Sequence, residues 1–328
     1  MADKFIRVRL VRIQGVDLSL FDFDFDLTWV VFFMNANEKV YGRYGGRDAR
    51  SAESRQSLAG LNYAMELALK THERDAEAKP AARSSKPLFV DDYPAAKRRI
   101  HNDCIHCHQV WEFRRDELKS TGQWSNDKVW IYPLPENVGI TLEVDRTDCV
   151  KAVKPGSAAE KAGLKVGDAL RRLNGMSAVT FLDAQYALHY APARGQTAIA
   201  WERNGKPMTG TLDLAEGWRK TNITWRPSVL DILPSLSLYG EDLSAKEKQA
   251  LALSEKHLAF RQDKTVHRDA KAAGVEPGDI IVGVDNLSLD MTMLEFLGYV
   301  RKNYLVGDQI TLNVLRGGKK LDLPITLK

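Results

Sequence analysis

Two cysteines and a histidine with a spacing typical of metal and redox chemistry lie in the run Cys104-Ile105-His106-Cys107-His108. A C-x-x-C-H run is the attachment sequence of c-type haem, in which two thiols bond to the porphyrin and the next histidine binds the iron. Two intervening residues let both thiols reach the porphyrin from one helical turn. The sequence therefore predicts one covalent haem c, held by Cys104 and Cys107, with His108 as the proximal iron ligand.

Other sites use the same cysteine spacing. A C-x-x-C pair also occurs in redox dithiols and as half of a zinc site. His101, His106 and His108 lie close enough in the sequence to complete a zinc site with the two thiols. A thioredoxin-type dithiol usually follows a strand, and no strand-like run precedes Cys104. A zinc site and a thiol-redox pair are therefore the alternatives to haem.

A haem iron bound by one histidine has a second axial position. Among the other histidines and methionines, His189 is favoured because it would tie a helix expected over residues 181–190 to the haem segment. Met176 is the second choice. An open position would instead allow ligand binding or peroxidase-like chemistry.

Composition places the chain among soluble globular proteins. Its 328 residues allow two to three domains, and 44% of them are hydrophobic and 27% charged. The formal net charge of +4 is spread along the sequence and gives little support to nucleic-acid binding. No run approaches the ~20 apolar residues of a membrane span.

The haem motif also predicts a compartment. Covalent haem attachment in bacteria takes place outside the cytoplasm, yet the first residues lead directly into a strand-like segment, with no visible signal peptide. We therefore expect a periplasmic or otherwise extracytoplasmic chain whose signal peptide has been removed. Three cysteines, two of them in the motif, argue against a disulfide framework.

The elements expected at the N-terminal end come from periodicity. Residues 5–13 alternate apolar and basic side chains and predict a strand, residues 28–34 and 40–44 predict a hairpin, and residues 57–69 predict a helix. The acidic-aromatic run at 21–26 could hold a metal, but its alternation favours one buried face and one solvated face.

This order of elements, with the runs Phe32-Phe33-Met34-Asn35-Ala36 and Gly42-Arg43-Tyr44-Gly45-Gly46, resembles the C-terminal part of a thioredoxin fold. The resemblance implies a partial thioredoxin-like α/β domain over residues 1–75 that lacks the first strand and the C-x-x-C helix. We expect it to serve in docking or structure. Residues 76–136 would form a linker and a small, mostly helical haem segment, whose many aromatic rings either wall the haem or pack against neighbouring elements.

The C-terminal half contains a repeat. The run from Val153 to Gly175, with its Pro-Gly turn, short helix and Gly167-Asp168 turn, resembles the PDZ domains of bacterial HtrA-type proteases. The run from Ala270 to Asn286 matches part of it in kind and spacing, and internal repetition supports both assignments. The resemblance implies two PDZ-like β-barrel/α domains, over residues 137–216 and 217–328.

PDZ domains bind an extended peptide by adding it as a strand and hold its terminal carboxylate with backbone N–H groups of a loop. The resemblance places this loop at Val138, Gly139 and Ile140 in the first domain and at Tyr239 and Gly240 in the second. Glu241 and Asp242 would repel a carboxylate that they faced, so an assembly surface is the alternative use of the second groove.

The expected fold class is therefore an α+β multidomain protein. The expected function is that of an extracytoplasmic mono-haem c-type cytochrome in electron transfer or redox sensing, with a redox partner protein and with protein or peptide partners at the PDZ-like domains. The alternative is a non-haem PDZ scaffold that binds peptides and carries a zinc or thiol-redox site. Neither G-x-S-x-G nor H-E-x-x-H occurs, and an enzymatic role stays open only as a haem-based redox activity.

Overall fold

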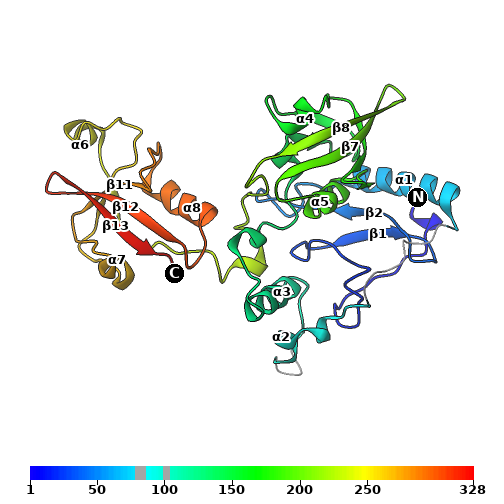
Figure 1. Ribbon diagram of the computed structural model, residues 1–328, viewed down its shortest axis with the longest axis horizontal. Coiled ribbons are helices and arrows are strands. Elements are labelled where there is room, and N and C mark those ends of the chain that lie inside the picture. The colour runs from blue at the N-terminus through cyan, green and yellow to red at the C-terminus, as the bar shows by residue number, and fades with distance from the viewer. Residues whose placement is uncertain (78–85, 99–103) are drawn as a thin grey trace. The chain divides into compact units, whose positions relative to one another are not determined.

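The computed structural model describes residues 1–77, 86–98 and 104–328, which form a mixed α+β chain (Figure 1). The chain divides into two compact units, Met1–Ser228 and Val229–Lys328. Within the described residues, no helix has the length and apolar character that crossing a membrane requires.

The N-terminal part of the first unit is a hairpin covered by one long helix. Strand β1 (Val30–Met34) pairs antiparallel with β2 (Val40–Gly45), and α1 (Leu58–Asp75) begins at Ser57, whose side chain accepts a hydrogen bond from the Gly60 N–H. The predicted hairpin and helix are both present. Their shared core consists of Phe33, Tyr41, Tyr44, Ala64, Met65 and Ala68.

Two predictions for the N-terminal segment are wrong. Residues 5–13 pair with no strand among the described residues, and Ile6 is 97% exposed. The aspartates of the acidic-aromatic run do not face solvent, because Asp24 is fully buried and Asp26 is 5% exposed. Both carboxylates bind the guanidinium of Arg226, so alternation in the sequence did not indicate which side chains are solvated.

The described residues between α1 and residue 140 contain only short helices. Aromatic rings from this segment, among them Trp111 and Tyr132, pack with Leu18 and Phe25 of the N-terminal segment in one apolar cluster. The rings therefore serve packing against neighbouring elements. The short helices of the first unit are η1 (Ala2–Lys4), η2 (Val90–Asp92), α2 (Pro94–Lys97), α3 (Gln109–Ser120), η3 (Asn126–Val129) and η4 (Pro135–Val138).

The rest of the first unit is built from antiparallel strands around an apolar core. Strands β3 and β4 form one pair, and a second sheet has the order β6-β5-β7-β8. A single bridge from Cys149 to Ala169 joins the two sheets. The elements are β3 (Ile140–Leu142), β4 (Val150–Val153), α4 (Ala158–Lys161), β5 (Ala169–Leu173), β6 (Met176–Ser177), α5 (Phe181–His189), β7 (Gly195–Arg203) and β8 (Lys206–Leu214).

The second unit has a five-stranded antiparallel sheet with the order β13-β12-β11-β10-β9. Its core includes Leu238, Phe260, Phe296 and Val300. The elements, with the 3-10 turn that leads into the unit, are η5 (Pro227–Val229), β9 (Gly240–Asp242), α6 (Ala245–Ala250), β10 (Phe260–Gln262), α7 (Arg268–Ala272), β11 (Ile280–Val284), α8 (Met293–Asn303), β12 (Gln309–Arg316) and β13 (Lys319–Thr326).

The sequence repeat is also a structural repeat. In the first unit Arg203 pairs with the buried Asp168 at 2.7 Å and donates to the Gly163 carbonyl. In the second unit Arg316 pairs with the buried Asp279 at 2.7 Å and donates to the Gly274 carbonyl. Both pairs lie in the same series of strand, short helix, strand, helix and two strands, although α6 and β6 each occur in one unit only. The sheets of the described residues are open, so the barrel predicted in each PDZ-like domain is not present.

Candidate peptide-binding site

Strand β3 and helix α5 form the two walls of the predicted first groove. The Gly139 carbonyl accepts from the Lys154 N–H and the Glu143 N–H donates to Cys149, both on the β4 side. Because alternate residues direct their backbone groups to opposite edges of a strand, the groups of Ile140 and Leu142 face away from β4. This is the edge to which a PDZ ligand would add.

The loop before β3 is tightly built. Val138 ends η4, and Gly139 follows with a φ of +92°. A Cβ on Gly139 would lie 2.1 Å from Ser157 Oγ, so only glycine fits there. Val138 is 2% exposed and Ile140 is fully buried. The predicted loop residues are therefore adjacent, but they are not open to solvent.

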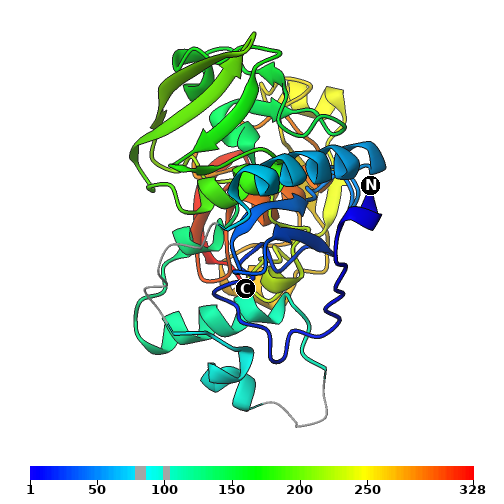
Figure 2. The same ribbon diagram turned by 90° about the vertical axis from the view of Figure 1, so that its right-hand side faces the viewer.

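The helix wall of this groove is covered as well. Phe181 is 6% exposed, and Gln185 is fully buried and donates to the Tyr132 carbonyl at 2.9 Å. Figure 1 shows β2 on the side of α5 away from β7 and β8, and in the view of Figure 2 the blue helix α1 lies between the green strands and the hairpin of β1 and β2. The chain's own N-terminal part thus lies against the walls of the first groove.

Asp183, on α5, is buried at this contact. Its Oδ1 accepts from the Arg43 N–H at 2.9 Å, while its Oδ2 is buried without a hydrogen-bond partner. Burial raises the pKa of Asp183 to about 7, although the charge of Arg43 acts in the opposite direction. Sequence spacing did not indicate Asp183 or its partner, since the two residues are far apart in the chain.

The second unit presents an uncovered strand edge in the equivalent position. Asp263 N–H donates to the Tyr239 carbonyl, and the Leu243 N–H donates to Ala259, both on the β10 side. By the same alternation, Gly240 and Asp242 direct their backbone groups away from β10. β9 is the last strand of its sheet among the described residues, and Tyr239 is 50% exposed.

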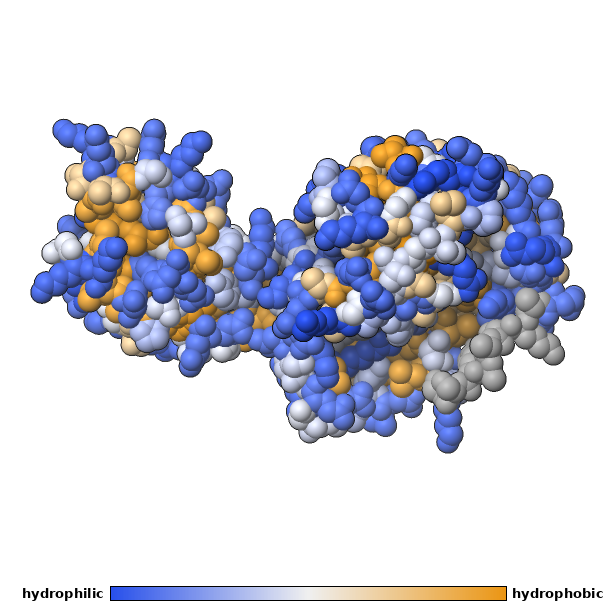
Figure 3. Space-filling view, turned by 45° about the horizontal axis from the view of Figure 1, so that its top comes forward, coloured by the Kyte–Doolittle hydropathy of each residue, from blue (hydrophilic) through white to orange (hydrophobic). Residues whose placement is uncertain are grey.

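Helix α8 lies beside this edge. Asp242 Oδ1 accepts from the Met293 N–H at 2.8 Å, which links the end of β9 to the first turn of α8. Figure 3 shows apolar side chains on the face of the second unit that is turned to the viewer. Large apolar side chains exposed in this unit include Tyr239, Leu287 and Leu294.

The predicted haem ligands of the cysteine motif lie at the start of α3. Cys104 and Cys107 are free thiols of exposed residues, and partial burial of the sulfur raises the pKa of Cys107. His108 Nδ1 lies 2.9 Å from Glu112 Oε1. The described residues include no group of three His, Cys, Asp or Glu side chains placed to hold a metal ion. His101 lies outside the described residues.

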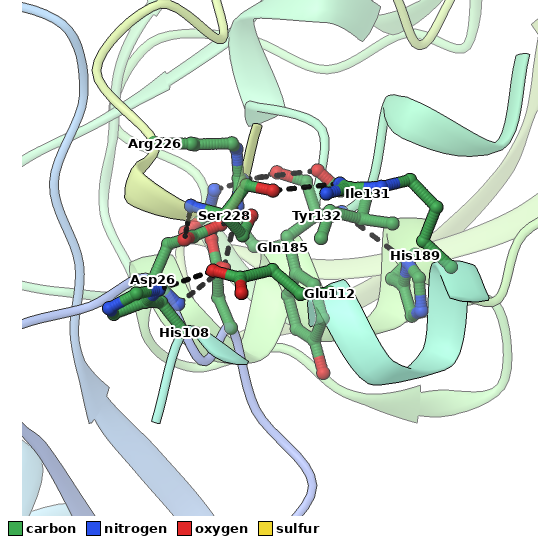
Figure 4. A network of polar contacts seen from close by, with 11 residues as sticks. Asp26, His108, Glu112, Ile131, Tyr132, Gln185, His189, Arg226 and Ser228 are labelled. Carbon is green, nitrogen blue, oxygen red and sulfur yellow. Dashed lines mark hydrogen bonds and ion pairs between the residues drawn. The ribbon is translucent and has the colours of Figure 1, made fainter. Parts of the chain in front are cut away.

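The predicted second iron ligands are not brought to His108. The Tyr132 N–H donates to His189 Nδ1 at 3.3 Å, and the two rings stack with centroids 4.4 Å apart. Figure 4 shows His108 and His189 at opposite sides of the polar network. Burial, together with the charge of Arg219, lowers the pKa of His189 to about 3. Met176 packs against the apolar core of its own sheet.

A family model described as a PDZ domain matches residues 149–203. One curated relative is the periplasmic pH-dependent serine endoprotease DegQ of Escherichia coli, 29% identical over 145 residues, which are 44% of this chain and 29% of that protein. Another is a probable periplasmic serine protease, do/HhoA-like, of Haemophilus influenzae, 26% identical over 169 residues, which are 51% of this chain and 33% of that protein. The chain thus spans about a third of the curated relatives that it matches.

Solved structures of HtrA-type proteases are also similar to parts of the chain. The serine endoprotease from Yersinia pestis is 23% identical with a TM-score of 0.21, and the similarity covers 23% of this chain and 27% of that chain. The protease AlgWS227A with a decapeptide is 16% identical with a TM-score of 0.28, covering 55% of this chain and 53% of that chain.

The comparisons overturn the interpretation of the chain as a c-type cytochrome. Its relatives are named as serine proteases, and the prediction of covalent haem c, with electron transfer as the function, is wrong. The geometry agrees, because the predicted second iron ligands lie elsewhere, His189 against the Tyr132 ring and Met176 against the core of its own sheet. The alternative, a PDZ protein that binds peptides, agrees better with these findings.

Proposed function

We propose that the chain is an extracytoplasmic PDZ protein that binds extended polypeptide segments along the edge of β9 in its second unit. The observation that carries the proposal is this edge, where Gly240 and Asp242 direct backbone groups away from β10. A segment added there would hydrogen-bond to these groups as a sixth strand, with α8 beside it.

The assignment of the second unit as a PDZ-like domain is part of the proposal. It is supported by the common order of strands and helices and by the equivalent ion pairs of Arg203 and Arg316. The division of the chain at residues 75, 136 and 216 stays a prediction, as does the thioredoxin-like origin of the hairpin and α1.

The relatives support the compartment and the setting. Both are named as periplasmic serine proteases, which favours an extracytoplasmic location and a role beside proteolysis. The proposal concerns the capture of polypeptide segments and not their hydrolysis, because the family match at residues 149–203 is to a PDZ domain.

Of the two chemistries left to the cysteine motif, the described residues favour a thiol pair over zinc. The two thiols are separated by two residues next to α3, and the described residues place no set of three metal-ligating side chains there. Because the pKa of Cys107 is raised, few thiolates form at neutral pH and oxidation is slow. We expect mass spectrometry in a glutathione buffer to detect a disulfide between Cys104 and Cys107 that forms faster at pH 9 than at pH 7. Zinc retained after gel filtration, and lost in Cys107→Ser, would contradict this.

Peptide binding at β9 is tested with Asp242→Pro in the full chain. Proline removes the Asp242 N–H that faces away from β10, and it leaves the ladder to β10 intact. The matched control is Asp242→Ala, which also loses the contact with the Met293 N–H but keeps its own N–H. The probes are fluorescent decapeptides of alternating apolar residues, with free and with amidated C-termini.

We expect binding in the wild type and in Asp242→Ala, and at least a tenfold loss in Asp242→Pro, measured by fluorescence anisotropy. A backbone edge gives affinity through its main-chain hydrogen bonds, so the loss of one donor weakens every probe. Equal binding by Asp242→Pro and Asp242→Ala would refute the proposal.

A further inference from the structure

We propose that the groove between β3 and α5 in the first PDZ domain is the docking surface for the chain's own residues 42–60, so that other peptides bind there only after this segment leaves. The chain would thus keep one of its PDZ grooves occupied from within. This inference concerns the first unit and stands whether or not β9 binds peptides.

Backbone groups of β2 bind the helix wall of the groove. The Arg43 N–H donates to Asp183 Oδ1 at 2.9 Å, and the Arg43 carbonyl accepts from Thr180 Oγ1 at 2.5 Å. A Cβ on Gly46 would lie 2.5 Å from the Phe181 ring. Close contact of main chain with the first turn of α5 is the placement that a bound peptide would need.

The Arg55 side chain links the helix wall to the loop before β3. Its guanidinium lies 4.6 Å from the centre of the Phe181 ring and 2.6 Å from Glu136 Oε1 on η4. It also binds Asp48 at 2.9 Å. Although burial opposes it, hydrogen bonds from Arg50 and Ser54 and the charge of Arg55 lower the pKa of Asp48 to about 2. Arg55 therefore joins α5 to η4, and Asp48 fixes its guanidinium in place.

The start of α1 contacts the segment that follows β3. A Cβ on Gly60 would lie 2.2 Å from the Val144 carbonyl oxygen, so the helix backbone lies close to the backbone just after the strand. Ser57 Oγ donates to Asp145 Oδ1 at 2.6 Å, and the Tyr63 hydroxyl donates to Asp148 at 3.0 Å.

Residues 42–60 thus contact three borders of the groove, which are the helix, the preceding loop and the segment after the strand. Phe181 at the start of α5 is shielded by this segment and is 6% exposed, while Gln185 further along α5 donates to the Tyr132 carbonyl. An arriving peptide meets a helix wall that is already in contact with other parts of the chain. It must replace the internal segment, and the ion pair of Arg55 with Glu136 must break first.

The test uses Gly60→Ala, which adds a methyl group where the Val144 carbonyl lies and favours the helical backbone of α1 itself. Gly298→Ala is the matched control, because Gly298 also lies within a helix and no atom is within 4 Å of its Cβ position. The probe is a fluorescent synthetic peptide of residues 42–60, added to the full chain. Hydrogen exchange reports release of residues 46–57 and protection of β3 and α5.

We expect Gly60→Ala to bind the probe at least tenfold more tightly than the wild type and Gly298→Ala do, with protection at β3 and α5. Arg55→Ala is a second opening variant should Gly60→Ala fold poorly. Its control is Arg50→Ala, which loses an exposed ion pair with the same Asp48.

Three results would overturn the proposal. The wild type could bind the probe as tightly as both opening variants do. The opening variants could expose residues 46–57 to exchange and still not bind the probe. The third such result is that hydrogen exchange of residues 46–57 is the same in both opening variants as in the wild type. Protection at β9 and α8 instead would assign probe binding to the second unit, and it would also count against the first groove.

Discussion

At the scale of single residues, Arg226 has the largest side chain that is fully buried. Its guanidinium binds Asp24 at 2.6 and 2.8 Å and Asp26 at 2.9 Å, and it donates to the Ile131 carbonyl (Figure 4). Burial raises the pKa of Asp24 and the charge of Arg226 opposes this shift. The negative charges of the two buried carboxylates are therefore balanced by the single guanidinium of Arg226.

We expect Arg226→Met to lower the free energy of unfolding of the first unit by about 3–5 kcal/mol, because two buried carboxylates lose their partner. Arg226→Lys should recover only part of this, since an ammonium group cannot make the paired hydrogen bonds of a guanidinium. Urea unfolding followed by circular dichroism measures both. A loss below about 1 kcal/mol in Arg226→Met would show that Asp24 and Asp26 do not need the cation.

His189 predicts a dependence of stability on pH. Its pKa in the folded chain is about 3 against a usual 6.5, so the unfolded chain binds the proton first on acidification. The stability that neutral His189 provides is complete above pH 6.5 and is lost as the pH falls towards 3, at up to about 1.4 kcal/mol per pH unit.

The variant that checks this is His189→Phe, which keeps a ring against Tyr132 and cannot titrate. We expect the difference in unfolding free energy between the wild type and His189→Phe to shrink or reverse between pH 6.5 and pH 4. The measurement is a series of urea titrations at fixed ionic strength. A difference that is constant over this range would contradict the lowered pKa.

Long-range partners explain why residue-scale prediction failed here. The alternation at residues 21–26 is the same whether its aspartates meet water or a cation, and the partner of Asp24 lies 202 residues away in the sequence. The C-x-x-C-H motif failed for a related reason. Five residues fix the spacing of two thiols and an imidazole, but they do not determine what the rest of the chain places opposite them.

At the scale of elements, patterns that local physics determines were predicted well. The hairpin of β1 and β2 and helix α1 were predicted from periodicity, and the turns at Gly163 and Gly274 from the resemblance to PDZ domains and from the repeat. Gly163 and Gly274 have φ values of +92° and +93°, and only glycine adopts such values at little cost. The strand predicted over residues 5–13 failed because an apolar-basic alternation does not show whether a pairing partner exists.

The loop before β3 supports a prediction at this scale. We expect Gly139→Ala to lower the free energy of unfolding by about 2–4 kcal/mol. The loss has two causes, because alanine is strained at a positive φ and its methyl group would clash with Ser157. Gly205→Ala is the control, because Gly205 has a φ of +75° and an open Cβ position. It should lose only about 1–2 kcal/mol. Equal losses in urea titrations of the two variants would show that the loop relaxes around the added methyl group.

At the scale of the whole molecule, the chain combines a PDZ domain with an N-terminal part whose contacts with it were not predicted. The Arg43 N–H and Asp183 are 140 residues apart, and Arg55 and Glu136 are 81 apart. No local sequence pattern indicates such long-range pairs. The repeat, in contrast, can be recognised by comparing two stretches of the same sequence. The resemblance to PDZ domains could therefore suggest where the grooves lie, but no sequence pattern indicated that residues 43 and 55 contact α5 and η4.

The two equivalent ion pairs allow the stability of each unit to be tested separately. Arg203 and Arg316 each bind a buried aspartate, and their side chains are similarly exposed at 26% and 32%. Each substitution leaves a buried carboxylate without its arginine partner. We therefore expect Arg203→Met to lower the free energy of unfolding of the first unit, and Arg316→Met that of the second unit, by about 2 kcal/mol each. Only the unfolding of residues 1–228 should shift in the first variant, and only that of residues 229–328 in the second. Hydrogen exchange of β7 and β12 in urea measures the two separately. Equal shifts of both strands in either variant would mean that the units unfold as one.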